Sequence, residues 1–360
     1  MAESSTTQDR TAFTIPSGVP VSVSIIDTTT KLTNIPWSFL MKPAIKGHDH
    51  SKDLPALSFL IEHSSGRRVL FDMGTRKDFM QINAPISARV KKLGWQPSAE
   101  KNVIEILEEN NIPGQSIEAL IWSHWHWDHV GDPSTFPSST KLVVGQGFKK
   151  AFVPAWPTNP DSHILEDNWK DRELVEIRFD EGPNRLTIGN FQAVDYFGDG
   201  SLYLVDSPGH AIGHLCGLAR TTTSPDTFIL MGGDACHYPG QFRPSKYSWI
   251  PASIDPHPFI ASLVVPCPGE MFEALQTSRG RAKDQAFYDQ AIAEDLDIAA
   301  ETIVKLQEAD VEPNIWVVIA HDQAVQRNVE LFPAKANNWK EKGWDKLTRW
   351  AFLKDFQAAV

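Results

Sequence analysis

The sequence predicts an α+β fold, and two observations carry this prediction. Short apolar runs of strand length dominate the first two thirds of the 360 residues, whereas helical spacing becomes prominent only later. Four of the apolar runs end in polar clusters that contain histidine or aspartate. Because strands hold the loops that follow them rigidly, we expect these clusters to meet at one edge of a sheet sandwich.

The first strands are expected at residues 21–26, 56–61 and 68–71, the last of them closing on a turn at Asp72. Residues 103–107 carry apolar side chains at helical spacing, and the Asn/Pro/Gly-containing stretch 110–114 ends that helix. A buried strand at 117–122 then leads into the six-residue run His124-Trp125-His126-Trp127-Asp128-His129.

The same order recurs downstream. Strands are expected at 141–144, 186–194, 202–205, 227–231 and 314–320, and three of them lead to His210, Asp234 and His321. A helix is expected at 287–308, with Leu296, Ala299, Ile303 and Leu306 on its apolar face.

The domain organisation predicted from these patterns is simple, because no internal repeat or linker is visible. We expect a disordered N-terminal arm at 1–15 and a single domain at 16–360. A proline-rich insertion is expected at about 237–290, either covering the site or as a surface embellishment. A C-terminal helix is expected at about 337–358, as a packing helix or as part of a homodimer surface.

Composition narrows the class of protein without choosing an enzyme. The net charge of -11 disfavours nucleic acid as a partner. Three cysteines make a disulfide framework improbable and favour a reducing compartment. No apolar run approaches the roughly 20 residues of a membrane span, and residues 1–14 do not resemble a signal peptide. We therefore expect a cytoplasmic protein with no membrane partner and a small-molecule substrate.

The run at 124–129 places four metal-ligand types within six residues. In an extended loop, side chains at i and i+2 point the same way, so His124 and His126 can reach one ion together. Asp128 and His129 must then face elsewhere, which indicates a second ion. An isolated strand-end histidine is more often structural, so the prediction depends on the whole set.

This run, followed by Gly131, resembles the HxHxDH signature of the metallo-β-lactamase superfamily, and the order of the later clusters matches too. The resemblance covers roughly residues 20–325 and implies the four-layer αβ/βα sandwich of that family. It implies that His124, His126 and His210 bind one metal ion, that Asp128, His129 and His321 bind another, and that Asp234 bridges them. Two Zn²⁺ ions are expected, with manganese, iron or cobalt as alternatives.

Residues around the ligands carry further expectations. Asp72 resembles the family's strand-end aspartate that orients the ligand loop, although a plain turn aspartate is the alternative. His214 is expected as a hydrogen-bonded histidine behind that loop. Trp125 and Trp127 are expected to pack in the core.

The catalytic and substrate-binding residues are less directly implied. The N-acyl-homoserine lactonase branch has a tyrosine three residues after the bridging aspartate, whereas this chain has His237 there and Tyr238 one later. We expect Asp128 and either Tyr238 or His237 to take part in catalysis. Aromatic residues of the insertion are expected to line the substrate pocket, namely Tyr247, Trp249 and Phe259.

The resemblance implies a hydrolase in which a hydroxide shared by two metals attacks a carbonyl carbon. The chain is similar to fungal lactamases and lactonases, which implies opening of a lactone, γ-lactam or cyclic carbamate such as a benzoxazolinone, as detoxification of a xenobiotic. One alternative is a thioesterase of the glyoxalase II or acyl-carrier-protein type. Another is a non-catalytic metal-binding protein on the same fold. Nuclease branches are disfavoured by charge, and oxidative diiron branches by the lack of a recognisable flavin domain.

Overall fold

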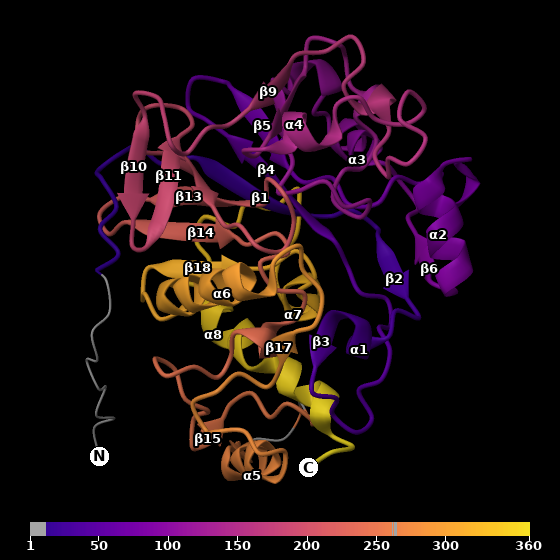
Figure 1. Cartoon of the computed structure of the whole chain (residues 1–360). Coiled ribbons are helices and arrows are strands. Elements are labelled where there is room, and N and C mark those ends of the chain that lie inside the picture. Colours follow the sequence, from indigo (N-terminus) through magenta and orange to yellow (C-terminus); the bar gives the residue numbers. More distant parts are fainter. Residues whose placement is uncertain (1–11, 261, 263–264) are drawn as a thin grey trace.

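Two six-stranded mixed sheets pack face to face in the computed structural model, which describes residues 12–260, 262 and 265–360 (Figure 1). The first sheet contains, in spatial order, β1 (Ser22–Asp27), β4 (Leu57–Glu62), β5 (Arg68–Phe71), β7 (Ala119–Ile121), β8 (Lys141–Val144) and β9 (Leu174–Glu176). The second contains β10 (Arg185–Ile188), β11 (Phe191–Asp195), β12 (Leu202–Asp206), β13 (Leu215–Thr222), β14 (Thr227–Met231) and β18 (Ile315–Val318).

The main core lies between the two sheets. Phe59 and Phe71 from the first sheet meet Leu204 and Met231 from the second, all almost completely buried. Each buried side chain of this size contributes roughly 1.5–3 kcal/mol relative to an exposed one. Because successive strand residues point to opposite faces, each sheet also has an outer apolar face, which is stable only when another layer buries it.

Helices cover both outer faces. On the first sheet, α3 (Val103–Glu109) and α4 (Phe148–Phe152) bury Val103, Leu107 and Phe148. On the second sheet, α6 (Leu296–Asp310) buries Ile303 and Leu306. Figure 1 shows these helices on opposite sides of the sheet pair. The expected four-layer sandwich is therefore confirmed.

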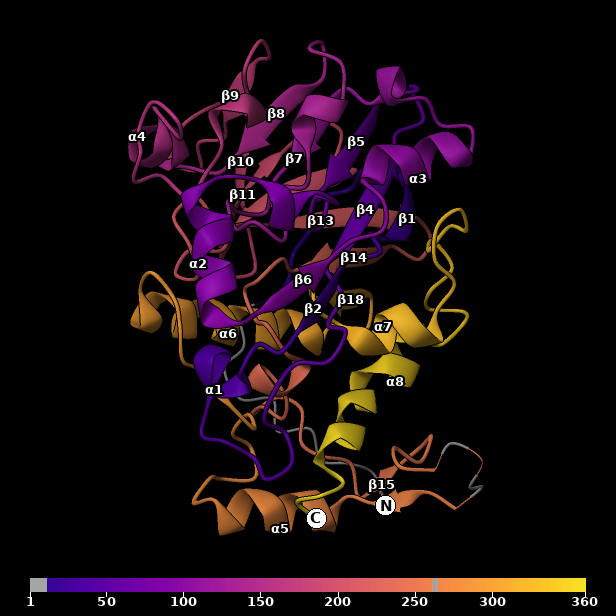
Figure 2. The ribbon, with the colours of Figure 1, turned by 90° about the vertical axis from the view of Figure 1, so that its right-hand side faces the viewer.

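The remaining elements lie at one end of the sandwich or beside it (Figure 2). The remaining α-helices are α1 (Trp37–Leu40), α2 (Pro85–Leu93), α5 (Glu270–Ser278), α7 (Gln323–Asn328) and α8 (Trp344–Arg349), and a 3₁₀ helix at Ala351–Phe356 follows α8. Three short strand pairs join distant segments: β2 (Lys31–Thr33) with β6 (Gln96–Ser98), β3 (Met41–Lys42) with β17 (Asp289–Gln290), and β15 (Ser253–Ile254) with β16 (Cys267–Pro268).

Several strands coincide with the sequence prediction, but β13 was missed. Its sequence includes Gly217 and Arg220, which interrupt the apolar pattern expected of a central strand. Arg220 is nevertheless fully buried, because its guanidinium donates to the Gly200 carbonyl and pairs with Asp226 while lying over the Phe228 ring. Polar pairing therefore makes a charged residue compatible with the core. The stretch predicted as one strand at 186–194 is a hairpin that turns at Gly189.

The predicted start of the long helix was wrong. Asp295 caps α6 by accepting hydrogen bonds from the N–H groups of Asp297 and Ile298, so the helix begins at Leu296 rather than near 287. Residues 289–290 instead form β17. Leu296, expected on the apolar face, is exposed.

The two chain ends were predicted as a disordered arm and a single helix. Residues 1–11 of the predicted arm lie outside the described residues, whereas Phe13 packs edge-on against Phe191 of the second sheet. At the other end, the region predicted as one helix holds α8 and the following 3₁₀ helix. Within the described part of the chain, no helix has the length and apolar character needed to span a bilayer.

The segment from 237 to 290 forms a second apolar cluster together with α1 and the C-terminal 3₁₀ helix. Phe272, Phe287 and Phe356 are fully buried there. Arg243 ties this segment to α6 through two hydrogen bonds to the Asp310 carboxylate, of 2.9 and 2.5 Å. The insertion predicted at about 237–290 is therefore a packed platform below the sandwich, and none of the described residues of its proline-rich part lines the cavity described below.

Candidate metal centre

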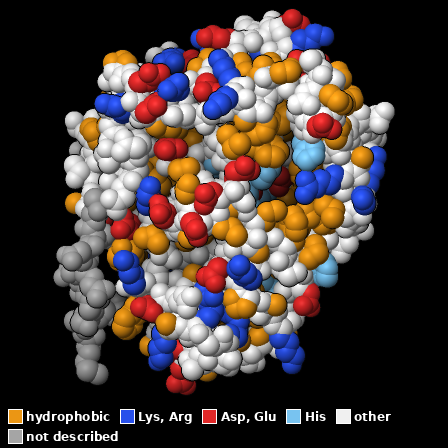
Figure 3. Space-filling model, in the orientation of Figure 1, with side chains coloured by type: hydrophobic (Ala, Val, Ile, Leu, Met, Phe, Trp, Pro, Cys, Tyr) orange, Lys and Arg blue, Asp and Glu red, His pale blue; other side chains and the backbone are white. Residues whose placement is uncertain are grey.

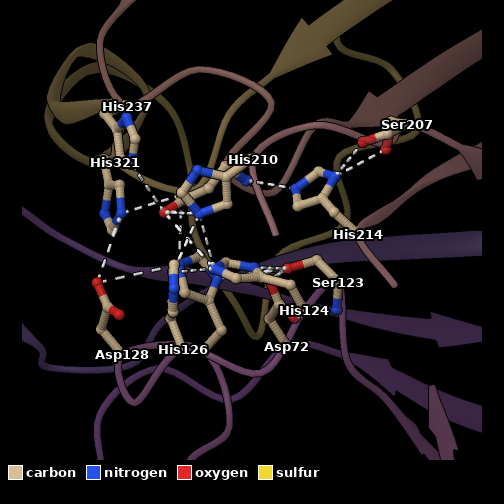
Figure 4. Close-up of polar contacts among 12 residues, drawn as sticks. Asp72, Ser123, His124, His126, Asp128, Ser207, His210, His214, His237 and His321 are labelled. Carbon is tan, nitrogen blue, oxygen red and sulfur yellow. Dashed lines mark hydrogen bonds and ion pairs between the residues drawn. The ribbon is translucent and has the colours of Figure 1, made fainter. Parts of the chain in front are cut away.

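Four loops at one edge of the sandwich bring the predicted ligands together. β7 leads to the run at 124–129, β12 to His210, β14 to Asp234 and β18 to His321. Figure 4 shows His124, His126, Asp128, His210 and His321, which come from segments far apart in the sequence, pointing toward one another. Gly233 makes this approach feasible, because it has a φ of +50° and a Cβ there would lie 2.8 Å from the Ser123 Cβ.

Three imidazole rings of the first ligand group converge through single nitrogen atoms. His124 Nε2 lies 2.8 Å from His126 Nδ1, and His210 Nε2 lies 3.0 Å from His126 Nδ1 and 3.2 Å from His124 Nε2. Nitrogen ligands placed tetrahedrally at the zinc–nitrogen distance of about 2.0–2.1 Å stand roughly 3.3 Å apart. Asp234 Oδ2, 3.7 Å from His210 Nε2, completes this group of four ligand atoms.

The other oxygen of Asp234 faces the second ligand group. Asp234 Oδ1 lies 3.0 Å from His321 Nε2 and 3.3 Å from His129 Nε2. Asp128 Oδ2 lies 3.6 Å from His321 Nε2 and 3.9 Å from His129 Nε2. One carboxylate thus turns its two oxygens to two ligand groups, which is the arrangement of a bridging ligand.

The protonation tendencies of the first group fit metal ligation. Burial lowers the pKa of His126 to about 3 and holds the pKa values of His124 and His210 well below the ordinary range. These imidazoles are therefore neutral near pH 7, which is the form that binds a metal ion.

The second group instead attracts positive charge. Burial alone would lower the pKa of His129, but the carboxylates of Asp234, Asp72 and Asp128 raise it well above the ordinary range. His129 Nε2 and Asp234 Oδ1 are both buried, and although they lie 3.3 Å apart, neither atom makes a contact with hydrogen-bond geometry among the described residues. Such atoms are costly unless a cation satisfies them. The donor set of the two groups therefore fits two metal ions of the kind that imidazole and carboxylate ligands bind.

Asp72 lies directly behind the ligand run. Its carboxylate accepts hydrogen bonds from the Ser123 backbone N–H at 2.6 Å, from the Ser123 hydroxyl at 2.7 Å and from His129 Nδ1 at 2.9 Å. The carboxylate therefore orients both the loop and one ligand ring. Its φ of +57°, unusual for a non-glycine residue, belongs to the turn that brings the carboxylate there.

His214 has the position that the sequence predicted for a histidine behind the ligand loop. Its Nδ1 lies 2.9 Å from the Ser207 carbonyl oxygen, and its Nε2 accepts a hydrogen bond from the Asp234 backbone N–H at 3.0 Å. Both ring nitrogens are thus occupied by protein partners. Burial lowers the pKa of His214 to about 4, so the ring is a neutral support for the Asp234 loop.

A cavity of about 290 Å³ opens beside the ligands, and Figure 3 shows hydrophobic side chains gathered around a hollow in which histidines are visible. The ligands His126, Asp128 and His210 form part of its wall. The apolar wall comes mainly from the N-terminal segment, from α2 and from the residues before α6: Leu32, Ile35, Phe39, Leu40, Leu54, Ile86, Val90, Leu93, Trp95 and Ile292. Arg89 and Glu294 are exposed charged residues among the lining side chains.

The structure does not bring the three predicted pocket residues to this cavity. The Tyr247 hydroxyl donates a hydrogen bond to the Glu308 carboxylate on α6, Trp249 is 62% exposed, and Phe259 packs against Phe272 of α5. None of the three lines the cavity, because their segment folds onto the platform below the sandwich. Trp125 and Trp127, expected in the core, line the cavity while their other faces pack against Phe152 and Phe79.

The two candidates after Asp234 separate clearly. Tyr238 is buried in the platform, where its hydroxyl contacts the Phe352 carbonyl and the Asp355 carboxylate, each at 3.0 Å. His237 lines the cavity, with its Nε2 3.5 Å from Asp234 Oδ2. His237 lines the cavity beside the ligands and Tyr238 does not, so the structure brings His237, and not Tyr238, to this cavity.

The sequence did not predict that α2 and residues 32–40 line the cavity. The only sequence signal was an ordinary amphipathic pattern at Pro85–Leu93, with Pro at the helix start and Gly94 at its end. Such a pattern predicts a helix packed on a core. It gives no information about which cavity the apolar face borders.

Comparison with known proteins gives concordant results. Residues 52–265 match the family model described as the metallo-beta-lactamase superfamily. The chain is 44% identical over 345 residues to gamma-lactamase FDB1 of Fusarium pseudograminearum, which covers 93% of this chain and 82% of that protein. It is 40% identical over 352 residues to metallo-hydrolase mfmC of Annulohypoxylon moriforme, covering 96% of this chain and 89% of that protein.

A solved structure shares the fold at low identity. It is an N-acyl homoserine lactone hydrolase with the product N-hexanoyl-L-homoserine bound at the catalytic metal center, at a TM-score of 0.56 and 16% identity. The match covers 89% of this chain and 100% of that chain. This likeness concerns the fold.

Proposed function

Because this chain belongs to the metallo-β-lactamase superfamily and is a dinuclear-metal hydrolase of the lactonase and lactamase type, we propose that it opens a small cyclic amide or ester, and most specifically a γ-lactam or a cyclic carbamate of the benzoxazolinone kind. The observation that carries the proposal is the small cavity, which has the two ligand groups on one side and apolar side chains on the other.

Two features support a ring-opening substrate of this kind. The relative from Fusarium pseudograminearum, which aligns along most of the chain, is named a gamma-lactamase. The cavity offers indole faces from Trp95, Trp125 and Trp127 beside the ligands, and flat apolar rings stack well on such faces. A compact bicyclic molecule suits a volume of about 290 Å³ better than a long polymer.

The two ligand groups support the proposed roles of the metal-binding residues. His124, His126, His210 and Asp234 would hold one ion, and Asp128, His129, Asp234 and His321 the other, with zinc proposed for both. When bound, such a pair supplies a Lewis acid for a carbonyl oxygen and a nucleophile derived from water. Asp72, Ser123 and His214 keep the ligands in place.

His237 is proposed to contact the substrate. It is buried, lines the cavity and has a ring that lies parallel to that of His321, with centroids 6.3 Å apart. Gln241 Oε1 accepts the His237 backbone N–H at 2.7 Å and fixes the loop. The imidazole can therefore donate a hydrogen bond to an oxygen or nitrogen of the ring being opened.

A substrate screen tests the proposed function. Purified protein is assayed with γ-lactams, benzoxazolinone-type carbamates, lactones and thioesters, in metal-loaded and chelator-treated form. We expect kcat/KM on a lactam or carbamate to exceed that on any thioester by at least about tenfold, and a chelator to abolish the activity until zinc is restored. Activity confined to thioesters, or retained in metal-free protein, contradicts the proposal.

His237 and Tyr238 provide a matched pair of variants. We expect His237→Phe to lower kcat by about 10²-fold, since one hydrogen-bond donor to the reacting group is lost. Tyr238→Phe should keep kcat within about twofold and lower the free energy of unfolding by about 1 kcal/mol, since it loses only the platform hydrogen bonds. Steady-state kinetics and urea denaturation measure both. A large drop in kcat for Tyr238→Phe would contradict the assignment.

A further inference from the structure

Gln290 is a buried residue whose side chain meets His210 on the side opposite to the ligand cluster. Its carboxamide lies 3.3 Å from His210 Nδ1, while His210 Nε2 points at His124 and His126. The other end of the carboxamide, Gln290 Oε1 as placed, is buried without a hydrogen-bond partner among the described residues. Two facts about one side chain thus need an explanation.

Three other histidines also point Nε2 at the ligand cluster, and each has an oxygen atom beside its Nδ1. His129 Nδ1 lies 2.9 Å from the Asp72 carboxylate, His321 Nδ1 lies 2.6 Å from the Pro55 carbonyl oxygen, and His124 Nδ1 lies 3.0 Å from the Ser123 hydroxyl. In each case an oxygen can accept the Nδ1 proton, so that Nε2 keeps a free lone pair for a metal ion. His210 needs the same kind of acceptor.

The chemistry therefore assigns the two ends of the Gln290 carboxamide, which are nearly identical in shape. An Nε2–H group facing His210 Nδ1 would require Nδ1 to be unprotonated, which conflicts with a neutral ring that binds a metal through Nε2. With the amide turned over, Oε1 accepts the His210 Nδ1–H and the buried oxygen is satisfied. The reorientation thus gives the His210 Nδ1–H an oxygen acceptor, and it moves the amide nitrogen to the end that has no partner among the described residues.

The backbone fixes Gln290 where this contact needs it. As part of β17 it pairs with Met41 of β3, and the next residue donates its N–H to the Leu40 carbonyl. Shortly after, the Glu294 N–H donates to the His210 carbonyl and the Asp295 N–H to the Gly209 carbonyl. The strap at 289–295 therefore connects the His210 loop to the segment that carries the cavity-lining Leu40, and Ile292 on the strap lines the cavity as well.

We propose that Gln290 is a positioning residue for the first metal ligand group, holding His210 with its proton on Nδ1 and its Nε2 free. The inference rests on the metal centre of the proposed function and is independent of the substrate. It assigns two roles to the strap at 289–295, because this segment both supports the ligand His210 and lines the cavity.

The test compares Gln290→Met, which has no acceptor, with Gln290→Glu, which keeps one. Zn²⁺ affinity of both sites is measured in metal-stripped protein by competition with a chromophoric chelator, and Co²⁺ absorption reports the ligand geometry. We expect Gln290→Met to weaken one of the two sites about 10–100-fold and to leave the other within about threefold. Gln290→Glu and the control Gln307→Met, a glutamine on α6, should keep both sites within about threefold.

A measurement on the unmodified zinc-loaded protein keeps the test independent of how the variants fold. In a ¹⁵N spectrum of labelled histidines, assigned with His210→Gln, we expect His210 to carry its proton on Nδ1. An unprotonated Nδ1, equal affinities for Gln290→Met and the parent, or equal losses for Gln290→Met and Gln290→Glu would overturn the inference. A parent that binds two zinc ions but opens no ring contradicts only the proposed substrate class, whereas a parent that binds none overturns both.

Discussion

Asp234→Asn is expected to lower kcat/KM by at least about 10³-fold and to leave fewer than two metal ions bound per chain. Asp234 is the only residue that belongs to both ligand groups of the described chain, with Oδ2 in one group and Oδ1 in the other. An amide keeps the size of the side chain but loses the negative charge that two adjacent cations require. A loss of 10³ corresponds to about 4 kcal/mol of transition-state stabilisation, which is within the several kcal/mol attributed to metal catalysis.

Metal content by emission spectrometry and kcat/KM on the best substrate of the screen measure this effect separately. Asp284→Asn, an exposed carboxylate of the platform, is the control and should match the parent in both. An Asp234→Asn protein that retains two ions and parental kcat/KM would show that the carboxylate is not a bridging ligand.

Arg243→Met is expected to lower the free energy of unfolding by about 3 kcal/mol. Arg243 pairs with Asp310, both side chains are only 4% exposed, and the variant leaves a buried carboxylate with Arg349 as its remaining partner at 2.8 Å. Removing one partner of a buried ion pair costs about 3–5 kcal/mol, and the remaining arginine places the effect at the lower end. The platform at 237–290 would also lose its tie to α6.

The same pair predicts a pH dependence. Burial alone would raise the pKa of Asp310, but Arg243 and Arg349 outweigh it and hold the pKa below its ordinary value. The resulting stabilisation is present above the ordinary aspartate value of about 4 and is lost as the pH falls toward the lower folded value. The difference between the parent and Arg243→Met should therefore shrink in acid.

Urea denaturation at pH 7 and near pH 3.5 checks both expectations. Lys246→Met removes an exposed positive charge from the same segment and should change the unfolding free energy by less than about 0.5 kcal/mol. Equal stability of Arg243→Met and Lys246→Met at pH 7 would contradict the assigned role of the buried pair.

The ligand set could be predicted because each member follows a strand in a short, recognisable pattern. The spacing His124-x-His126-x-Asp128-His129 is local, and His210, Asp234 and His321 each follow an apolar run within a few residues. The predicted helix start was wrong because Asp295 caps α6 and residues 289–295 form the strap that precedes it.

The substrate pocket could not be predicted in the same way. The aromatic residues after Asp234 suggested an insertion covering the site. Tyr247 instead contacts Glu308 of α6 and Phe259 packs in the platform, whereas Phe39 and Trp95, about 55 residues apart, line the cavity. Phe39 and Trp95 contact each other edge-on, with ring centroids 4.9 Å apart. This contact depends on how α1 and the segment after α2 pack together. A contact between segments so far apart leaves no local pattern in the sequence from which it could be predicted.

By itself the sequence determined the fold class and the residues that converge on the candidate metal centre, because ligand type, strand periodicity and strand-end position are properties of short segments. The tertiary structure decided which of His237 and Tyr238 faces the cavity, which segments line it and how Gln290 reaches His210. These depend on which way a side chain turns when distant segments pack, and a one-residue difference along an extended chain reverses that direction.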